Sequence, residues 1–289
     1  MLFGVSRQAL YKRQKSEIQK ADQSKQVCEV IRRVRQFLPG SGTRKCYDII
    51  KEAMLQRGIA IGRDRVHRIL QINNLIIRRR KNHFYTTDSK HRYRKYDNLA
   101  QYLDVTKPEQ LWVSDITYIK TKEKDLYLSL VTDAYSKKIM GFHLADHLKA
   151  TGPIEALKMA ISNREYPNRK LMHHSDKGVQ YCCDAYIALL NKYEINISMT
   201  SKYDPYENAI AERINGTIKN EFELDHGLPD HQYAQRELNK TVRIYNELRP
   251  HLSCDMQTPE MRHSKNPYPK KLYTKQVWER IIFDNFNPN

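Results

Sequence analysis

The sequence predicts an α/β protein in which a domain with a mixed five-stranded sheet follows a small all-helical domain. Three observations predict this. Apolar residues recur at helical spacing between residues 28 and 70. From about residue 105, three segments rich in β-branched and aromatic residues follow one another, separated by short polar turns. After residue 150, helical and strand patterns alternate, which is typical of an α/β sheet.

Three short helices are predicted in the first domain, at 28–38, 44–57 and 63–70. The first stops at Pro39-Gly40 and the second at Gly58, residues that end helices because proline lacks the amide donor and glycine favours the left-handed conformation. Short basic helices joined by tight turns predict a helix-turn-helix unit.

The third of these helices has the pattern of a recognition helix. Val66, Ile69 and Leu70 can face inward. The outward face carries three arginines, Arg63, Arg65 and Arg68. We therefore expect these arginines to contact DNA. The alternative is a generic basic three-helix unit that contacts only phosphates.

The net charge of +17 lies entirely in the first third of the chain. Residues 1–95 hold 24 Lys and Arg against 7 Asp and Glu, whereas residues 96–289 hold 26 of each. Such a charge implies a polyanionic partner, and nucleic acid is favoured over a membrane because these short helices present no large apolar face. The basic, aromatic-interleaved run 77–95 is typical of a linker along a phosphate backbone, with a solvated tether as the alternative. Its predicted DNA contacts are Arg78, Arg79 and Arg80.

We expect five segments along the chain. They are an N-terminal helical segment at 1–27, a basic helix-turn-helix domain at 28–82, a basic linker at 83–104, the core domain at 105–265 and a C-terminal tail at 266–289.

Composition also restricts location and redox chemistry. No stretch approaches the roughly 18 apolar residues of a membrane span and the start lacks the apolar run of a signal peptide, so a cytoplasmic protein is expected. The five cysteines are an odd number and widely scattered, which argues against a disulfide framework. His173-His174 and Cys182-Cys183 are adjacent pairs without the spacing of a zinc site, so core packing is favoured.

The core domain is predicted to contain five strands and four helices. The strands are expected at 111–119, 126–133, 138–144, 171–175 and 195–199. The helices are expected at 151–163, 178–193, 205–222 and 231–248.

Three acidic residues of this domain are candidates for catalysis. Asp115 lies inside a strand between apolar residues, where a charge is costly unless it is paired or metal-bound. Asp176 ends the fourth strand, at the sheet edge where active sites of α/β proteins usually lie. Glu212 lies on a helix, with Asn208 and Lys219 on roughly the same face, where we expect DNA.

Each acid has an ordinary alternative, as a turn residue, a paired core acid or a surface helix charge. Together, two strand carboxylates and one helix carboxylate can meet at one end of a sheet and bind two divalent metal ions. Such a pair of ions stabilises the attacking and leaving oxygens of a phosphodiester displacement.

The order of these acids, with 35 residues between Asp176 and Glu212, resembles the D-D-E triad of retroviral integrases and insertion-sequence transposases. The chain is most similar to the OrfB-type transposases of the insertion-sequence-three family. The motifs that carry this resemblance are Trp112-x-x-Asp-Ile-Thr-Tyr-Ile119, His174-Ser-Asp-Lys-Gly-x-Gln-Tyr181, Asn208-Ala-x-x-Glu-Arg213 and Tyr245-Asn-x-x-Arg-Pro-His251. One departure is Glu207-Asn208, where the family usually has Asp-Asn.

The resemblance implies a ribonuclease H-like core that uses two Mg²⁺ or Mn²⁺ ions, held by Asp115, Asp176 and Glu212. It implies binding to the ends of the element, strand cleavage and transfer of a 3′-hydroxyl to new DNA. It also implies an OrfA partner or a frameshift fusion, and oligomerisation on DNA. Two alternatives stay open: a ribonuclease H-like nuclease that hydrolyses without rejoining, and a catalytically silent DNA-binding regulator.

Overall fold

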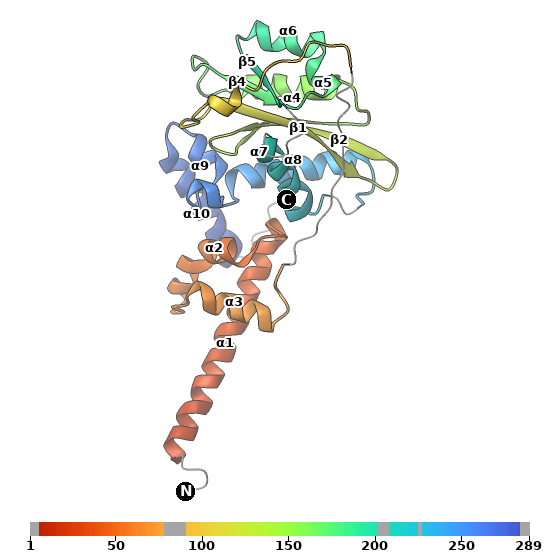
Figure 1. Ribbon diagram of the computed structural model, residues 1–289. Helices are drawn as coiled ribbons and strands as arrows, with labels where there is room; N and C mark the ends of the chain where they lie inside the picture. The colour runs from red at the N-terminus through yellow and green to blue at the C-terminus, as the bar shows by residue number, and fades with distance from the viewer. Residues whose placement is uncertain (1–5, 78–90, 202–207, 225–226, 284–289) are drawn as a thin grey trace. The chain divides into compact units, whose positions relative to one another are not determined.

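The computed structural model describes residues 6–77, 91–201, 208–224 and 227–283. The chain forms two compact units (Figure 1). The first comprises Met1–Arg79 together with Lys275–Asn289, and the second comprises Arg80–Thr274.

The first unit is helical, with α1 at Arg7–Phe37, α2 at Thr43–Gln56 and α3 at Arg63–Ile72. The three helices contact one another pairwise. Gly58, with φ of +73°, follows α2 in the left-handed conformation that glycine adopts without strain. The predicted helix-turn-helix arrangement of short helices is therefore present in α2 and α3.

The first helix is longer than predicted. The sequence indicated a helical segment at 1–27 and a separate short helix at 28–38, whereas α1 runs through both as one unbroken helix of 31 residues from the cap at Ser6, whose hydroxyl accepts a hydrogen bond from the Ala9 amide at 3.2 Å. Residues 7–37 contain no proline or glycine and many residues of high helix propensity, so nothing interrupts the helix. Its buried residues begin at Val27, which explains why the apolar pattern marked only the second half.

The C-terminal segment is also a helix, α10 at Pro267–Phe283, where a tail was expected. Its residues from Lys275 onward belong to the first unit. Trp278 packs edge to face on Phe37, with ring centroids 6.4 Å apart. Arg33 and Arg57 donate hydrogen bonds to the Ile282 carbonyl at 2.9 and 3.1 Å. The helical unit is therefore completed by residues from both ends of the chain.

The second unit is built on a five-stranded mixed sheet in the order β3-β2-β1-β4-β5. The strands are β1 (Leu111–Lys120), β2 (Asp125–Asp133), β3 (Ile139–Ala145), β4 (Met172–Ser175) and β5 (Asn196–Met199). The first three are antiparallel neighbours, and β4 and β5 run parallel to β1. The predicted ribonuclease H-like core is confirmed in its mixed sheet and its order of elements.

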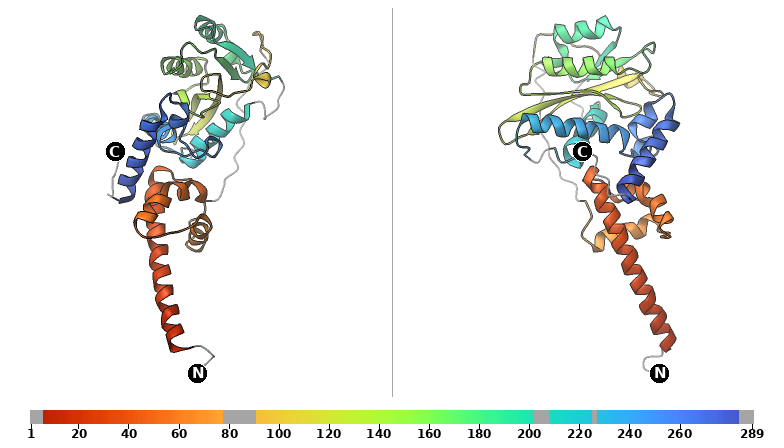
Figure 2. Two further views of the ribbon diagram at one scale, coloured as in Figure 1. Left: turned by 90° about the vertical axis from the view of Figure 1, so that its left-hand side faces the viewer. Right: turned by 180° about the vertical axis from the view of Figure 1, so that it is seen from behind.

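Helices cover both faces of this sheet (Figures 1 and 2). One face carries α4 (Thr151–Ser162), α5 (Val179–Cys182) and α6 (Asp184–Lys192), and the other carries α7 (Ala209–Glu221) and α8 (His231–Glu247). The single helix predicted at 178–193 is divided at Cys183, whose extended backbone (φ −68°, ψ 149°) caps α6. The remaining elements are η1 (Ala100–Tyr102), η3 (Leu252–Cys254) and α9 (Pro259–His263).

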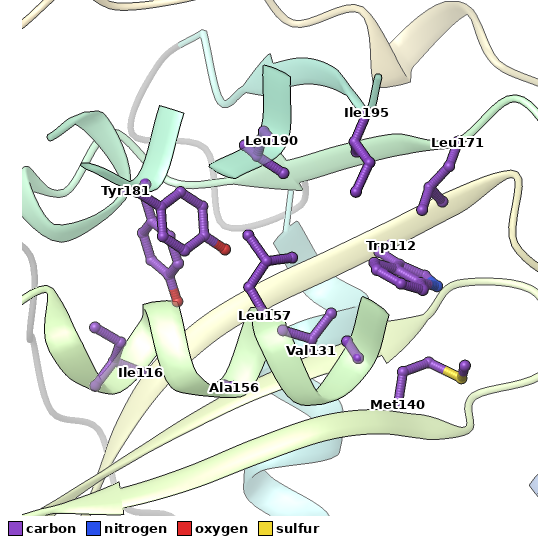
Figure 3. Close-up of a cluster of buried hydrophobic side chains, with 12 residues drawn as sticks. Trp112, Ile116, Val131, Met140, Ala156, Leu157, Leu171, Tyr181, Leu190 and Ile195 are labelled. Atoms are coloured by element: carbon purple, nitrogen blue, oxygen red, sulfur yellow. The ribbon is translucent and has the colours of Figure 1, made fainter. Parts of the chain in front are cut away.

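The main core lies between the sheet and α4, α5 and α6 (Figure 3). Trp112 of β1 is fully buried there and lies between Leu171 and Met140 in the figure. The sheet approaches α4 closely at Gly141: a Cβ at this position would lie 2.6 Å from the Ala160 backbone nitrogen and nearer still to the Ala156 carbonyl oxygen. Within the part of the chain that the structure describes, no helix has the length and apolar character needed to cross a bilayer.

Candidate active site

Asp115 lies on the central strand β1, opposite Leu130 of β2. Its carboxylate accepts hydrogen bonds from the Ile116 amide and from the Asn215 side chain, each at 2.8 Å. Burial and the nearby Asp176 carboxylate raise the pKa of Asp115 to about 7, with a further contribution from Glu212. The hydrogen bonds from Asn215 and Ile116 act in the opposite direction but do not cancel this effect. The environment therefore disfavours the charged form of Asp115 unless a cation is present.

Asp176 follows the last residue of β4, which runs parallel to β1. The register places Val113 opposite His174, two residues before Asp115 on one strand and two before Asp176 on the other, and the Asp176 carboxylate is near enough to Asp115 to raise its pKa. The Gly178 amide donates to the Asp176 carboxylate at 2.9 Å and closes a tight turn after the strand. This turn directs the chain away from the sheet and leaves the carboxylate at its carboxyl edge.

Glu212 lies in the first turn of α7, which packs against β1 and β2. Two amide side chains hold this helix on β1. Asn208, at the N-terminus of α7, donates to the Ser114 carbonyl at 3.0 Å, and Asn215 donates to Asp115. Glu212 is exposed and lies along the helix between these two contacts.

The structure thus brings the three predicted acids into one electrostatic environment, because Asp176 and Glu212 both raise the pKa of Asp115. The three carboxylates do not lie as close together as the ligands of a single ion. Among the described residues, no three His, Cys, Asp or Glu side chains form a group that could hold a metal ion.

The donor atoms nevertheless fit a hard divalent cation. Carboxylate and amide oxygens are the ligands that Mg²⁺ and Mn²⁺ prefer. The buried Oδ1 atoms of Asn208 and Asn215 accept no hydrogen bond from the described residues. A cation would also relieve the charge repulsion that raises the pKa of Asp115.

Asn215 is a residue of the site that the sequence analysis missed. It lies three residues after Glu212, a spacing that places two residues on the same side of a helix, and that signal was available. Its bond to Asp115 could not be inferred from spacing alone, because it depends on how α7 packs on β1.

Two residues expected to face DNA are buried instead. Lys219 is 8% exposed and takes part in interactions within the protein, so little of its side chain is open to DNA here, and its contact with DNA stays a prediction. Asn208 is 7% exposed and its amide is bonded to the Ser114 carbonyl. The physical reason is that α7 beyond Glu212 is covered on more than one side, since Asn215, Thr217, Ile218 and Lys219 point in different directions and are all buried.

The arginines of α3 are exposed as predicted, and Val66, Ile69 and Leu70 are buried. Arg63 pairs with Asp64 at 2.8 Å, and Arg65 donates to the Gln23 side chain at 2.9 Å. Arg68 is exposed on the same helix. The other predicted DNA contacts, Arg78, Arg79 and Arg80, lie outside the described residues.

The histidine and cysteine pairs contribute to core packing. His173 Nε2 lies 2.8 Å from the Ser114 hydroxyl and 2.9 Å from the Tyr186 hydroxyl, and burial lowers the pKa of His173 to about 3. The Cys182 thiol lies 3.6 Å from the Met199 sulfur. All five cysteines are free.

Comparison with known proteins places this chain among integrase cores. Models of the integrase core domain match residues 105–205 and 193–259. A 31 kDa protein of insertion element IS600 from Shigella sonnei is 30% identical over 254 residues, covering 86% of this chain and 92% of that protein. The transposase for insertion sequence element IS904 from Lactococcus lactis is 28% identical over 73% of this chain and 84% of its own length.

A further relative is the transposase InsF for insertion sequence IS3A from Escherichia coli, which is 34% identical over 164 residues and 55% of either chain. Among solved structures, the catalytic core domain of HTLV-2 integrase in complex with magnesium aligns with a TM-score of 0.44 and 23% identity, covering 55% of this chain and 98% of that chain.

Proposed function

The chain belongs to the integrase-core transposases of the IS3 family of insertion sequences, and on that premise we propose that Asp115, Asp176 and Glu212 form the site at which it cuts and rejoins DNA strands. The observation that carries the proposal is that Asp176 and Glu212 both raise the pKa of Asp115, a carboxylate on the central strand that Asn215 of the Glu212 helix also contacts. Acids with a perturbed pKa at a sheet edge are typical of catalytic sites.

The three carboxylates would hold two Mg²⁺ or Mn²⁺ ions, which when bound activate the attacking oxygen and stabilise the leaving oxygen of a phosphodiester. Asp115 and Asp176 supply the fixed side of the site, since both are on or beside parallel strands in the centre of the sheet. Glu212 supplies the third carboxylate from α7, and because its side chain is exposed it can approach the two aspartates. Asn215 holds one oxygen of Asp115 and so orients the other.

We also propose a division of labour on DNA. The exposed arginines Arg63, Arg65 and Arg68 would bind the ends of the element, and the acids of the second unit would carry out the chemistry. In this view the basic linker and Arg78, Arg79 and Arg80 follow the phosphate backbone. An OrfA chain and further copies of this protein are the partners that a transposase with two DNA ends to join would require.

The proposed chemistry is tested by strand cleavage and strand transfer on duplexes that carry the element ends, with Mg²⁺ supplied. Asp176→Asn should abolish both reactions while DNA affinity stays near that of the wild type, because the amide keeps the shape and removes the charge. Asp125→Asn, at an exposed acid of the same sheet, is the matched control and should react normally. Normal cleavage by Asp176→Asn would refute the mechanism.

The same assay separates transposition from simple hydrolysis. A precleaved duplex with a free 3′-hydroxyl should become joined to target DNA. Release of nicked products without any joined product would favour the nuclease instead. Tight, end-specific binding with neither product in the wild type would favour the silent regulator.

A further inference from the structure

The Tyr245–His251 motif contains none of the three acids and is not part of the proposed metal site. It occupies the end of α8 and the turn that follows. Tyr245 is fully buried, and its hydroxyl donates a hydrogen bond to the Lys137 carbonyl at 2.9 Å. The same hydroxyl also lies 2.9 Å from His251 Nε2. Asn246 accepts from the Ile139 amide and donates to the Ile139 carbonyl, both at 3.0 Å. The end of α8 is thereby bonded to the backbone at the start of β3, an edge strand.

Arg249 follows this bonded end of α8 and contacts α7, the helix that carries Glu212. Its Nε and one terminal nitrogen donate to the two carboxylate oxygens of Glu221, each at 2.9 Å. Arg249 is only 3% exposed, and its guanidinium lies 5.5 Å from the centre of the Tyr245 ring. Two parallel bonds from a planar fork fix both distance and orientation, which a single ion pair does not.

Glu221 is the last residue of α7, nine positions beyond Glu212 and so about 14 Å further along the helix. The other end of α7 is fixed by Asn208 and Asn215 on β1. Glu212 thus lies on a helix that two amides hold on β1, at its start and at its middle, and that one partly buried ion pair holds at its end. Without the ion pair the helix would be held only through Asn208 and Asn215 and could turn about its own axis there, which would change the direction in which Glu212 projects.

A purely stabilising role explains this arrangement less well. Arg249 is buried and the Glu221 side chain is 27% exposed, so the lost hydration of the arginine offsets part of the attraction between the two charges. The two parallel bonds add a defined geometry to the pair. We propose that Arg249 is a positioning residue of the transposase, which sets the position of Glu212 in the active site by holding the end of α7 through Glu221. The inference rests on the proposed role of Glu212.

The test measures two quantities in the full-length protein: Mn²⁺ binding without DNA, followed by the free-ion electron paramagnetic resonance signal, and the dependence of DNA cleavage on Mg²⁺ concentration. Arg249→Gln should weaken Mn²⁺ binding by the same factor by which it shifts the Mg²⁺ dependence, and unchanged Mn²⁺ binding would count against the proposal. Arg249→Gln removes the charge and one of the two bonds, so the half-saturating Mg²⁺ concentration should rise on the order of 10-fold, as for other residues that orient metal ligands. Excess Mg²⁺ should restore much of the rate. Arg249→Lys should give a smaller shift, because it keeps the charge without the fork.

A matched control is Arg243→Gln on α8, whose ion pair with Glu247 is at the surface, with the arginine side chain 70% exposed. This variant should leave the Mg²⁺ dependence unchanged. Glu221→Gln should reproduce the shift of Arg249→Gln, and the double variant should be no worse than either single variant, because all three break the same link.

An unchanged half-saturating Mg²⁺ concentration in a folded Arg249→Gln protein would overturn the proposal, as would shifts of the two single variants that add in the double variant. If Arg249→Gln and Arg249→Lys both fail to fold, the residue serves stability and the proposal is wrong. Asp176→Asn distinguishes this failure from that of the proposed function. Normal cleavage by Asp176→Asn refutes the catalytic assignment, whereas inactive Asp176→Asn with normal Mg²⁺ dependence in Arg249→Gln refutes only the positioning role.

Discussion

The surroundings of Asp115 disfavour the ionised form of its carboxyl group. Because its pKa is raised to about 7, the folded protein binds a proton there that the unfolded chain releases near pH 3.8. Above pH 7 the charged form therefore destabilises the metal-free protein. The cost is on the order of 4 kcal/mol, since the pKa rises by about three units and each unit corresponds to about 1.4 kcal/mol. The proposed cation would remove this cost by neutralising the charge of Asp115.

We predict that Asp115→Asn raises the melting temperature of the metal-free protein at pH 8. The amide removes the repulsion from Asp176 and can donate to the buried Oδ1 of Asn215, which accepts no hydrogen bond from the described residues. Each kcal/mol regained should add about 2–4 °C. Thermal unfolding followed by circular dichroism, with chelator present, measures the change. A lower melting temperature would show that Asp115 is a stabilising core acid.

A second group of buried charges lies around His263, away from the acids of the site. His263 Nδ1 is 2.9 Å from the Ser136 hydroxyl, and its Nε2 is 3.4 Å from Glu109. Burial alone would lower the pKa of His263, but the Asp133 and Glu109 carboxylates outweigh it and raise the pKa above 6.5. Burial alone would raise the pKa of Glu109, but His263 and Arg164 lower it to about 2.

The signs of these shifts define a pH window. The raised pKa of His263 contributes stability that is complete below pH 6.5 and is lost as pH rises through the folded-state value. The lowered pKa of Glu109 contributes stability that is present above pH 4.5 and is lost as pH falls toward 2. His263→Gln should therefore destabilise the protein more at pH 6 than at pH 9. A drop in melting temperature that is equal at both pH values would show that the charge of His263 contributes nothing.

Sequence reasoning identified individual acids better than individual contacts. Asp115 was predicted because a charge inside an apolar strand needs a reason, and its environment agrees with that reasoning. The burial of Lys219 was not foreseen, because helical spacing gives the direction of a side chain relative to Glu212 but not which parts of the helix are covered. The contact of Arg249 with Glu221 could not be predicted from the sequence, because the two residues are 28 positions apart and their pairing depends on how α7 and α8 pack.

At the scale of the elements, the strands and their order followed closely from the sequence, since β-branched runs and turns are local signals. Helix boundaries followed less well. The start of α1 has no burial pattern, because residues 7–26 are largely exposed. The helix α10 was missed, because its apolar residues Trp278, Ile281 and Ile282 are buried against residues near the opposite end of the chain.

The close approach of β3 to α4 gives a prediction at this scale. Gly141→Ala should destabilise the protein by about 1–3 kcal/mol or more, because its Cβ would overlap the backbone of α4 at Ala156 and Ala160, and backbone atoms cannot rotate away. Gly216→Ala is the matched control, because a Cβ there would meet only the end of Asn220 at 3.9 Å. Denaturant unfolding of the two variants decides it: equal stability would mean that α4 can move away from the sheet without cost.

All three arginines of α3 are exposed, and their exposure predicts how they bind. In the full-length protein, replacing Arg63, Arg65 and Arg68 with Ala should lower the affinity for element ends. If the arginines contact base edges, each should account for roughly 1–3 kcal/mol of discrimination against scrambled duplexes. If they bind only phosphates, affinity for both duplexes should fall equally, and the slope of log K against log[salt] should decrease by about 0.9 for each phosphate that is no longer neutralised. No change with either duplex would remove α3 from DNA recognition.

At the scale of the whole molecule, charge and chemistry are separated along the sequence. The excess of positive charge lies in residues 1–95, and the acids of the proposed site lie in the neutral remainder. The first unit, however, includes residues from Lys275 onward, so a fragment that ends at residue 95 would expose Phe37 and its neighbours. DNA binding by this unit is therefore best measured in the full-length chain.

The central claim is that Asp115, Asp176 and Glu212 together bind divalent ions. Titration of the full-length protein with Mn²⁺, followed by the decrease of the free-ion electron paramagnetic resonance signal, measures it directly without DNA or catalysis. The wild-type protein should bind Mn²⁺, and Asp115→Asn, Asp176→Asn and Glu212→Gln should each weaken that binding by about 10-fold or more, whereas Asp125→Asn should not. Binding of Mn²⁺ that is unchanged in the three variants, or absent from the wild type with and without element-end DNA, would contradict the account.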